Sequence, residues 1–167
     1  DRSTVDVAES LAERMIGVLH EPLDLDGVPI VVSASVGVAC QHAADLTAED
    51  FHAVFDVNVL GVVRTTTAFL PLLRRSSDPV IVNVGSGMGS LELTHDPSRP
   101  ESSMVAPAYT SSKAALTMLT TQYAKAFTDI RINVADPGYT ATDLNANSGP
   151  QTVTEGTDAI VMLATEG

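Results

Sequence analysis

The spacing of apolar positions changes near Pro22, which predicts a helix followed by strands. Before that proline, long apolar side chains recur every four residues, at Leu11, Met15 and Leu19, which predicts a helix over residues 3–21. Asp26-Gly27 then separates LDL from VPIVV, a strong short-range signal for a hairpin with a type I′ turn. The run VPIVVSASVGVA, residues 28–39, predicts a strand, with Pro29 at its beginning where a missing N–H is tolerated.

From about residue 45, helical and strand patterns alternate. A long, mostly apolar helix is expected over 48–74, opened by a capping box of Thr47 and Asp50 and kinked or ended by Pro71. The short apolar runs at 79–84 and 130–134 are typical of parallel strands buried on both faces. Further helices are expected over 109–127 and from a cap at Thr154 to the C-terminus. This alternation predicts an α/β fold with a mainly parallel sheet.

Composition narrows the classes of function. A chain of 167 residues, 44% hydrophobic and 18% charged, suits one globular domain with a substantial core. The net charge of −12 argues against nucleic acid or an anionic membrane as a main partner, although acidity also serves solubility alone. Cys40 is the only cysteine, so no intrachain disulfide forms and a cytoplasmic location is expected. We find no apolar run close to the roughly 20 residues of a membrane span, and we assign no metal site.

Tyr109 and Lys113 stand four residues apart in AYTSSKAAL, at the start of a predicted helix. Positions i and i+4 share one helix face, so the two side chains are expected to point into one cleft. A phenol with a pKa of about 10 exchanges protons poorly at neutral pH, and a neighbouring ammonium favours the phenolate. Such a pair is therefore a candidate for acid–base catalysis. By itself, the spacing fits a surface tyrosine beside a solvated lysine equally well.

Other polar residues lie where an α/β fold places its ligands. Ser86 follows the predicted strand 79–84, where its hydroxyl could bond a substrate carbonyl, although it also suits an ordinary turn. Asn58 lies within the apolar helix. If its amide is buried, it must find partners, and it could then perturb the helix and hold a water. The alternative is an asparagine that faces the surface. After the strand 130–134 come further candidate ligands at Pro137, Gly138, Thr140 and Thr142.

Taken in order, these residues resemble the short-chain dehydrogenase/reductase family from about residue 45 to 167. The segments that carry the resemblance are N-V-x-G at 58–61, LPLL at 70–73, N-V-x-S at 83–86, YTSSK at 109–113 and PGYTAT at 137–142. Each is weak alone, and their joint order in alternating strands and helices makes the resemblance specific.

The resemblance implies an NAD(P)-dependent oxidoreductase that reduces a carbonyl or oxidises an alcohol. Tyr109 would be the general acid, Lys113 would lower its pKa and hold the nicotinamide ribose, and Ser86 would position the carbonyl. Asn58 would anchor a proton-relaying water. The loop after strand 130–134 would contact NADP or NAD through Pro137, Gly138, Thr140 and Thr142. Residues 87–108 would form a substrate-facing loop for a bulky carbonyl compound, and helices 48–74 and 109–127 would pair in a homo-oligomer.

The family's dinucleotide turn, T-G-x-x-x-G-x-G, and its N-N-A-G segment are both absent from the chain. The glycines at 85–89 do not replace that turn, because they lack its spacing and precede a loop rather than a helix. We therefore expect a partial Rossmann-like three-layer fold that lacks the first βαβ unit. An alternative follows: a catalytically inactive α/β protein with relic catalytic residues.

Residues 1–44 resemble a different family. AESLAERMIGVLHEPLDLDGVPIVVSASVGVA is similar to the later part of a GGDEF diguanylate cyclase domain, without that family's metal and nucleotide ligands. The strand at 28–39 falls where a short-chain dehydrogenase has its fourth strand. This suggests a chimera, with 1–44 and 45–167 packed as one domain. The start at Asp1 rather than methionine suggests a piece of something larger.

Overall fold

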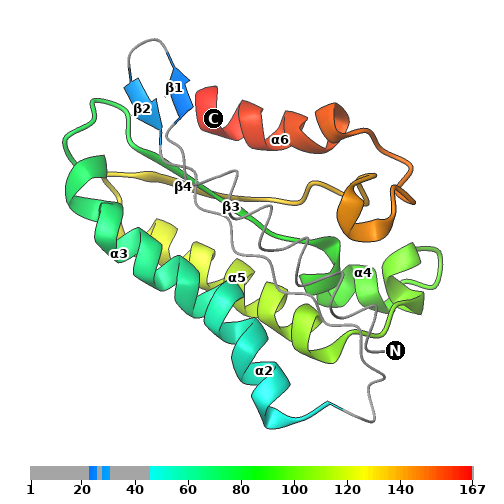
Figure 1. Ribbon diagram of the computed structural model, residues 1–167. Coiled ribbons are helices and arrows are strands. Elements are labelled where there is room, and N and C mark those ends of the chain that lie inside the picture. The colour runs from blue at the N-terminus through cyan, green and yellow to red at the C-terminus, as the bar shows by residue number, and fades with distance from the viewer. Residues whose placement is uncertain (1–22, 26–27, 31–45, 167) are drawn as a thin grey trace.

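The structure is a computed structural model that describes residues 23–25, 28–30 and 46–166 (Figure 1). Its helices and strands alternate along the chain after residue 46, as the sequence predicts. The strands are β1 (Leu23–Leu25), β2 (Val28–Ile30), β3 (Val80–Val84) and β4 (Arg131–Ala135). The α-helices are α2 (Ala48–Phe55), α3 (Gly61–Leu73), α4 (Leu91–His95), α5 (Pro107–Ala126) and α6 (Val153–Thr165). The shorter turns are η1 (Asp56–Leu60), which is π-helical, and the 3₁₀ turns η2 (Gly87–Gly89), η3 (Pro100–Ser103) and η4 (Asp143–Asn145).

An antiparallel hairpin opens the described part. β1 and β2 pair with Leu23 opposite Ile30 and Leu25 opposite Val28, which confirms the predicted hairpin. The Asp26-Gly27 turn, the helix expected over 3–21 and the continuation of the 28–39 strand beyond Ile30 lie outside the described residues.

One continuous helix runs from Ala48 to Leu73 through α2, η1 and α3. Its capping box is confirmed: the Thr47 N–H donates to Asp50 Oδ2 at 2.8 Å, and the Asp50 N–H donates to Thr47 Oγ1 at 3.3 Å. Pro71, expected to kink or end the helix, lies inside its last turn. The helix continues for two residues beyond it, since a missing N–H there removes only one bond close to the natural end.

The same helix is long and apolar enough to cross a membrane, with a mean hydropathy of 1.3, which the sequence analysis did not anticipate. A single helix of this kind is weak evidence for a span, because core helices pass the same test. Here it packs along α5 through α2 and η1.

Helices cover both faces of a parallel sheet. β3 and β4 pair in parallel, with Val80 opposite Arg131 and Val84 opposite Ala135. The α2–α3 helix and α5 lie on one side, and α6 lies on the other (Figure 1). The described residues therefore form three layers, which confirms the predicted α/β class with a parallel sheet. The most buried apolar side chains are Val54, Met88, Ala108, Leu116, Ile130, Ile132 and Ala135.

The strand β3 is less buried than its apolar sequence predicts. Val80 to Asn83 are only half-buried and Val84 is 41% exposed, whereas Ile132 and Ala135 of β4 are buried. A groove of about 510 Å³ runs along β3 and accounts for this difference. Its other wall comes from η1 and α3.

The last helix begins earlier than expected. Thr152, not Thr154, caps α6, because Thr152 and Glu155 form a complete capping box. The Thr152 N–H donates to Glu155 Oε2 at 2.8 Å, and the Glu155 N–H donates to Thr152 Oγ1 at 3.3 Å. Thr154 lies inside the first turn and has no N3 carboxylate partner, since Thr157 stands three residues on.

Candidate active site

The carboxyl ends of β3 and β4 form the edge at which the predicted residues gather. The Gly85 N–H donates to Ala135 O at 2.7 Å, which extends the parallel ladder by one residue. A Cβ on Gly85 would lie 2.7 Å from Val134 Cγ2, so this position requires glycine's small size. Ser86 follows immediately, and the next residues turn away from the sheet as η2.

The Ser86 side chain caps that turn and bonds locally. Its Oγ accepts the Met88 N–H at 3.2 Å. η2 then packs against α5 so closely that a Cβ on Gly89 would lie 2.7 Å from the Lys113 carbonyl carbon. The Ser86 turn is thereby held against the turn of α5 that carries Lys113.

Tyr109 and Lys113 lie in the first two turns of α5, which Pro107 opens at a position where its missing N–H costs nothing. The Lys113 Nζ lies 5.6 Å from the centre of the Tyr109 ring, so the structure brings the two side chains together. The ammonium also donates a hydrogen bond to Val84 O at 2.9 Å. Burial lowers the pKa of Lys113, and the negative charge of Asp136 partly opposes this effect.

Asn58 lies at the centre of the π-helical turn η1, where the sequence analysis expected the helix to be perturbed. Single π-helical turns are often found at functional sites. The Asn58 side chain is half-buried rather than surface-facing, and its Nδ2 donates to Ser112 Oγ at 2.9 Å. The Ser112 hydroxyl in turn donates to Tyr109 O at 2.7 Å. Asn58 is thus connected to the helical turn that carries Tyr109.

The predicted cofactor contacts Pro137, Gly138, Thr140 and Thr142 lie in the loop after β4, and hydrogen bonds within the loop order it. Gly138 has a φ of 68°, and its N–H donates to Asp136 Oδ1 at 3.0 Å. The Thr140 hydroxyl donates to Pro137 O at 3.1 Å. Asn145 orders the rest of the loop: its Nδ2 donates to Thr140 O at 2.7 Å. Its Oδ1 accepts the Thr142 N–H at 3.0 Å.

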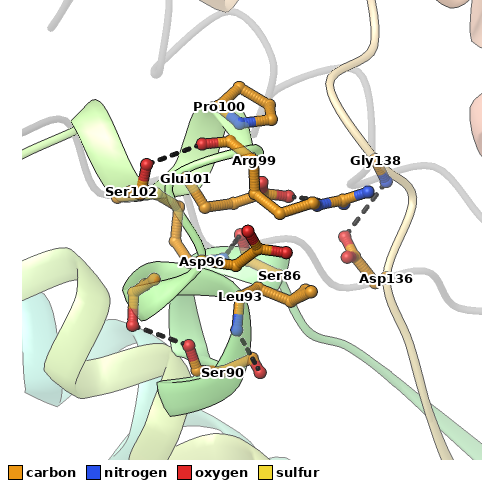
Figure 2. Close-up of polar contacts among 12 residues, drawn as sticks. Ser86, Ser90, Leu93, Asp96, Arg99, Pro100, Glu101, Ser102, Asp136 and Gly138 are labelled. Carbon is orange, nitrogen blue, oxygen red and sulfur yellow. Dashed lines mark hydrogen bonds and ion pairs between the residues drawn. The ribbon is translucent and has the colours of Figure 1, made fainter.

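The segment between Ser86 and Tyr109 folds over this edge as η2, α4 and η3. Figure 2 shows Arg99 and Glu101 of this segment beside Asp136 and Gly138. Arg99 pairs with Glu101 at 3.0 Å. The Glu101 carboxylate contacts the residue after Ser86, because its Oε1 lies 2.8 Å from the position of a Cβ on Gly87. Asp136 Oδ2 lies 3.1 Å from the same point.

Hydrogen bonds within the segment lower the pKa of Glu101: the first comes from its own N–H and the second from Arg99. Glu101 Oε2 is buried and has no hydrogen-bond partner in the described part of the chain. The segment therefore contacts the Ser86 turn through a charged group that the sequence analysis did not identify.

Four residues that shape this edge were missed: Ser112, Asp136, Asn145 and Glu101. Ser112 was visible only as a spacer within YTSSK, and its contact to Asn58 spans 54 residues of sequence. Asp136 stands directly before Pro137-Gly138, so its place at a strand end was the one available signal. No group of three metal-ligating side chains occurs among residues 46–166.

The groups at this edge fit the nicotinamide and ribose part of a dinucleotide. A hydroxyl and an ammonium, from Tyr109 and Lys113, suit ribose hydroxyls. The left-handed Gly138 lies against the Gln151 side chain, which fills the space where a Cβ would stand. The sequence lacks T-G-x-x-x-G-x-G, the turn with which the family holds the pyrophosphate.

Comparison with known proteins gives a consistent result. The family described as short chain dehydrogenase matches residues 4–152. The short-chain dehydrogenase anuI of Penicillium roqueforti is 38% identical over 125 residues, which cover 71% of this chain and 50% of that protein. A (+)-neomenthol dehydrogenase of Capsicum annuum is 34% identical over 142 residues, which cover 65% of this chain and 45% of that protein. The chain thus spans about half the length of these relatives.

Solved structures agree on the fold. Salutaridine reductase of Papaver somniferum superposes with a TM-score of 0.61 at 26% identity, over 72% of this chain and 52% of that one. The NADPH-bound carbonyl reductase from chicken fatty liver superposes with a TM-score of 0.61 at 25% identity, over 89% of this chain and 56% of that one. The carbonyl reductase Sniffer of D. melanogaster superposes with a TM-score of 0.67 at 19% identity, over 97% of this chain and 67% of that one. The family match starts at residue 4, so it covers nearly all of the segment likened to a GGDEF domain. The comparisons give no support to a second family there.

Proposed function

Because the chain belongs to the short-chain dehydrogenase family, we propose that it supplies the catalytic half of an NAD(P)-dependent oxidoreductase. The reaction is the interconversion of a carbonyl compound and an alcohol. The single observation that carries this proposal is the joining of Asn58, Tyr109 and Lys113 at the edge where Ser86 follows β3. Asn58 is connected through Ser112 to the turn of α5 that carries Tyr109, and Lys113 lies beside the Tyr109 ring. The turn η2, which Ser86 caps, packs onto the same helix.

The roles follow from the chemistry of each group. Ser86 donates its hydroxyl hydrogen to the substrate oxygen, since Oγ only accepts from Met88. Tyr109 transfers a proton to that oxygen during reduction and removes it during oxidation. Lys113 places its ammonium beside the Tyr109 ring, where it would hold the nicotinamide ribose. Asn58 holds the water through which protons reach Lys113.

The dinucleotide supplies the hydride when bound. Lys113 and Tyr109 would hold its ribose, and Pro137, Gly138, Thr140 and Thr142 would lie against the nicotinamide. Solved relatives include structures with NADPH and with NADH, which supports a nicotinamide dinucleotide without deciding between the two. The pyrophosphate would require a turn that this sequence does not contain.

We further propose that residues 28–39 take the place of the family's fourth strand, so that one domain runs through both halves and the first βαβ unit is not represented. The family match from residue 4 supports this assignment over a GGDEF origin. The helices 48–74 and 109–127 would pair between copies of the chain. Leu60, Leu72 and Met118, each at least 50% exposed, offer the apolar surface for such pairing. A cytoplasmic location is consistent with the single cysteine.

Oxidation of NADPH or NADH by the 167-residue chain, followed by absorbance with a panel of bulky ketones, tests the proposal. Tyr109→Phe removes the proton donor and is expected to abolish turnover. Tyr123→Phe is the matched control, because Tyr123 lies on the same helix and stacks on Phe127 at 5.3 Å, away from the site. This control is expected to retain activity.

The missing T-G-x-x-x-G-x-G turn supports one competing proposal, an inactive protein with relic residues. Calorimetric titration with NADPH separates the two. Binding with turnover that depends on Tyr109 supports the enzyme, whereas a folded chain that binds no dinucleotide at millimolar concentration establishes the relic.

A further inference from the structure

Ser112 is completely buried and uses both of its hydrogen-bonding capacities. Its exposed fraction is 0%. Its Oγ lies 2.7 Å from Tyr109 O, and a carbonyl oxygen only accepts, so the single hydroxyl hydrogen points there. The Oγ can then only accept a further bond, and the group that donates is Asn58 Nδ2 at 2.9 Å.

This arrangement determines the orientation of the Asn58 amide. The NH₂ end must face Ser112, because the carbonyl end would oppose a lone pair on Oγ. The Oδ1 end is left without a bond to any other described residue. Asn58 and Lys113 both line the groove along β3, and the Lys113 ammonium itself donates to Val84 O.

We propose that Ser112 is a positioning residue, which fixes the acceptor end of the Asn58 amide toward the groove shared with Lys113. An oxygen there can accept a hydrogen bond from a water bound to the ammonium, whereas an NH₂ group would oppose that bond. The inference rests on the proposed function, since it assigns Ser112 to the proton path of that reaction. Because Ser112 is completely buried, it would touch neither substrate nor dinucleotide.

The helix α5 contains a matched control. Thr120 is 2% exposed, its hydroxyl donates to Leu116 O at 2.8 Å, and its Oγ1 accepts Asn83 Nδ2 at 2.9 Å. This is the same arrangement, a buried hydroxyl between a helix carbonyl and an asparagine amide, about two turns beyond Lys113. Removing either hydroxyl leaves an asparagine NH₂ without its partner, so both changes carry a similar structural cost.

The experiment compares Ser112→Ala with Thr120→Val in the 167-residue chain without ligand. The first readout is the NMR signal of the Asn58 side-chain NH₂, assigned through Asn58→Asp. The second is the NMR titration of the Lys113 side chain. Tyr109 and Asp136 are the other titratable groups that the structure places near the ammonium, and both are retained. Hydrogen exchange of the Asn58 NH₂ is expected to quicken at least tenfold in Ser112→Ala, and the midpoint of Lys113 is expected to fall.

Thr120→Val should change neither readout. Unchanged Asn58 and Lys113 signals in Ser112→Ala, or equal changes in both variants, would overturn the proposal. If Ser112→Ala fails to fold, Ser112→Cys replaces it, since a thiol keeps the shape but accepts hydrogen bonds weakly. Ser112→Thr, which keeps the hydroxyl, is expected to restore the wild-type signals.

Turnover provides a separate readout. In an active chain, Ser112→Ala should lower kcat about tenfold with little change in KM, because the amide acts on proton transfer rather than on substrate binding. If the wild-type chain shows no turnover, the proposed function fails while the two NMR readouts still decide the role of Ser112. An unchanged kcat in an active Ser112→Ala variant overturns the inference.

Discussion

Substitution of Gly89 by alanine tests whether the Ser86 turn is held against α5 by direct backbone contact. An added Cβ would lie 2.7 Å from the Lys113 carbonyl carbon, 2.8 Å from the Ala114 nitrogen and 3.0 Å from the Lys113 oxygen. Non-bonded carbon atoms approach comfortably to about 3.5–4.0 Å, so η2 must move by roughly 1 Å. The atoms that it meets belong to the backbone of a 20-residue helix and cannot move aside.

The expected cost follows from this displacement. Overpacking of this kind costs about 1–3 kcal/mol, offset by about 0.4–1 kcal/mol because alanine restricts the unfolded chain more than glycine. Gly89→Ala should therefore lower the free energy of unfolding by about 1–2 kcal/mol. Neither Gly87 nor Gly89 has a positive φ, so backbone strain does not contribute.

Gly87→Ala is the matched control within the same 3₁₀ turn. The three atoms nearest to its Cβ would all be side-chain ends: Glu101 Oε1 at 2.8 Å, Asp136 Oδ2 at 3.1 Å and Leu93 Cδ1 at 3.3 Å. These can rotate away, so we expect a change within about 0.5 kcal/mol of wild type. Urea unfolding followed by circular dichroism gives the free energy of unfolding of both variants, provided that its dependence on urea concentration, the m-value, stays constant. Equal midpoints for the two variants, or a larger loss at Gly87, would refute the reasoning.

Three further predictions concern stability. Leu116→Ala, at a position 2% exposed, should destabilise the fold by about 2–5 kcal/mol in the same urea assay, and a loss below 1 kcal/mol would show that the α5–sheet interface repacks freely. Burial lowers the pKa of Lys113 in the folded chain below the usual 10.5. Between these two pKa values the unfolded chain binds more protons than the folded chain, so the free energy of unfolding rises with pH over that window. Lys113→Met should remove this rise in urea midpoints measured through the window, and a rise that persists would assign it to another group. Hydrogen bonds lower the pKa of Glu101, so its contribution is present above its usual 4.5 and is lost as pH falls through the lowered value. Glu101→Gln should therefore be less stable than wild type at neutral pH and converge with it in acid, whereas a constant difference would show that the charge is irrelevant.

Local sequence patterns predict the order of elements well because each depends on neighbouring residues. A continuous apolar run identifies β3, period-3.6 spacing identifies α5, and the Thr47 capping box identifies the start of α2. The predicted cap at Thr154 was wrong, because the complete capping box belongs to Thr152, with Glu155 three residues after it. The half-exposed state of β3 could not be predicted from VIVNV, since burial depends on what lies beside the strand.

The candidate residues were predictable as types but not as contacts. Tyr109 and Lys113 share a helix face by spacing alone, so their approach follows from sequence. The bond from Asn58 to Ser112 joins two helices 54 residues apart in the chain, and no local rule specifies it. Likewise, Glu101 meets Gly87 only because the intervening loop folds back over the strand ends.

Unfavourable features gather at the carboxyl edge of the sheet, whereas stabilising features lie away from it. Thr47 and Thr152 begin their helices with complete capping boxes. At the edge, by contrast, the Lys113 ammonium is desolvated, Glu101 Oε2 is buried without a described partner, and η1 departs from α-helical geometry around Asn58. Each of these features costs free energy and persists only if the surroundings hold it in place. Their coincidence at one edge supports the proposal that this edge is a site for chemistry. If Lys113→Met stabilises the fold and the wild-type chain binds no dinucleotide, we infer that the edge is a relic. If the wild-type chain binds a dinucleotide, the result supports the proposed function.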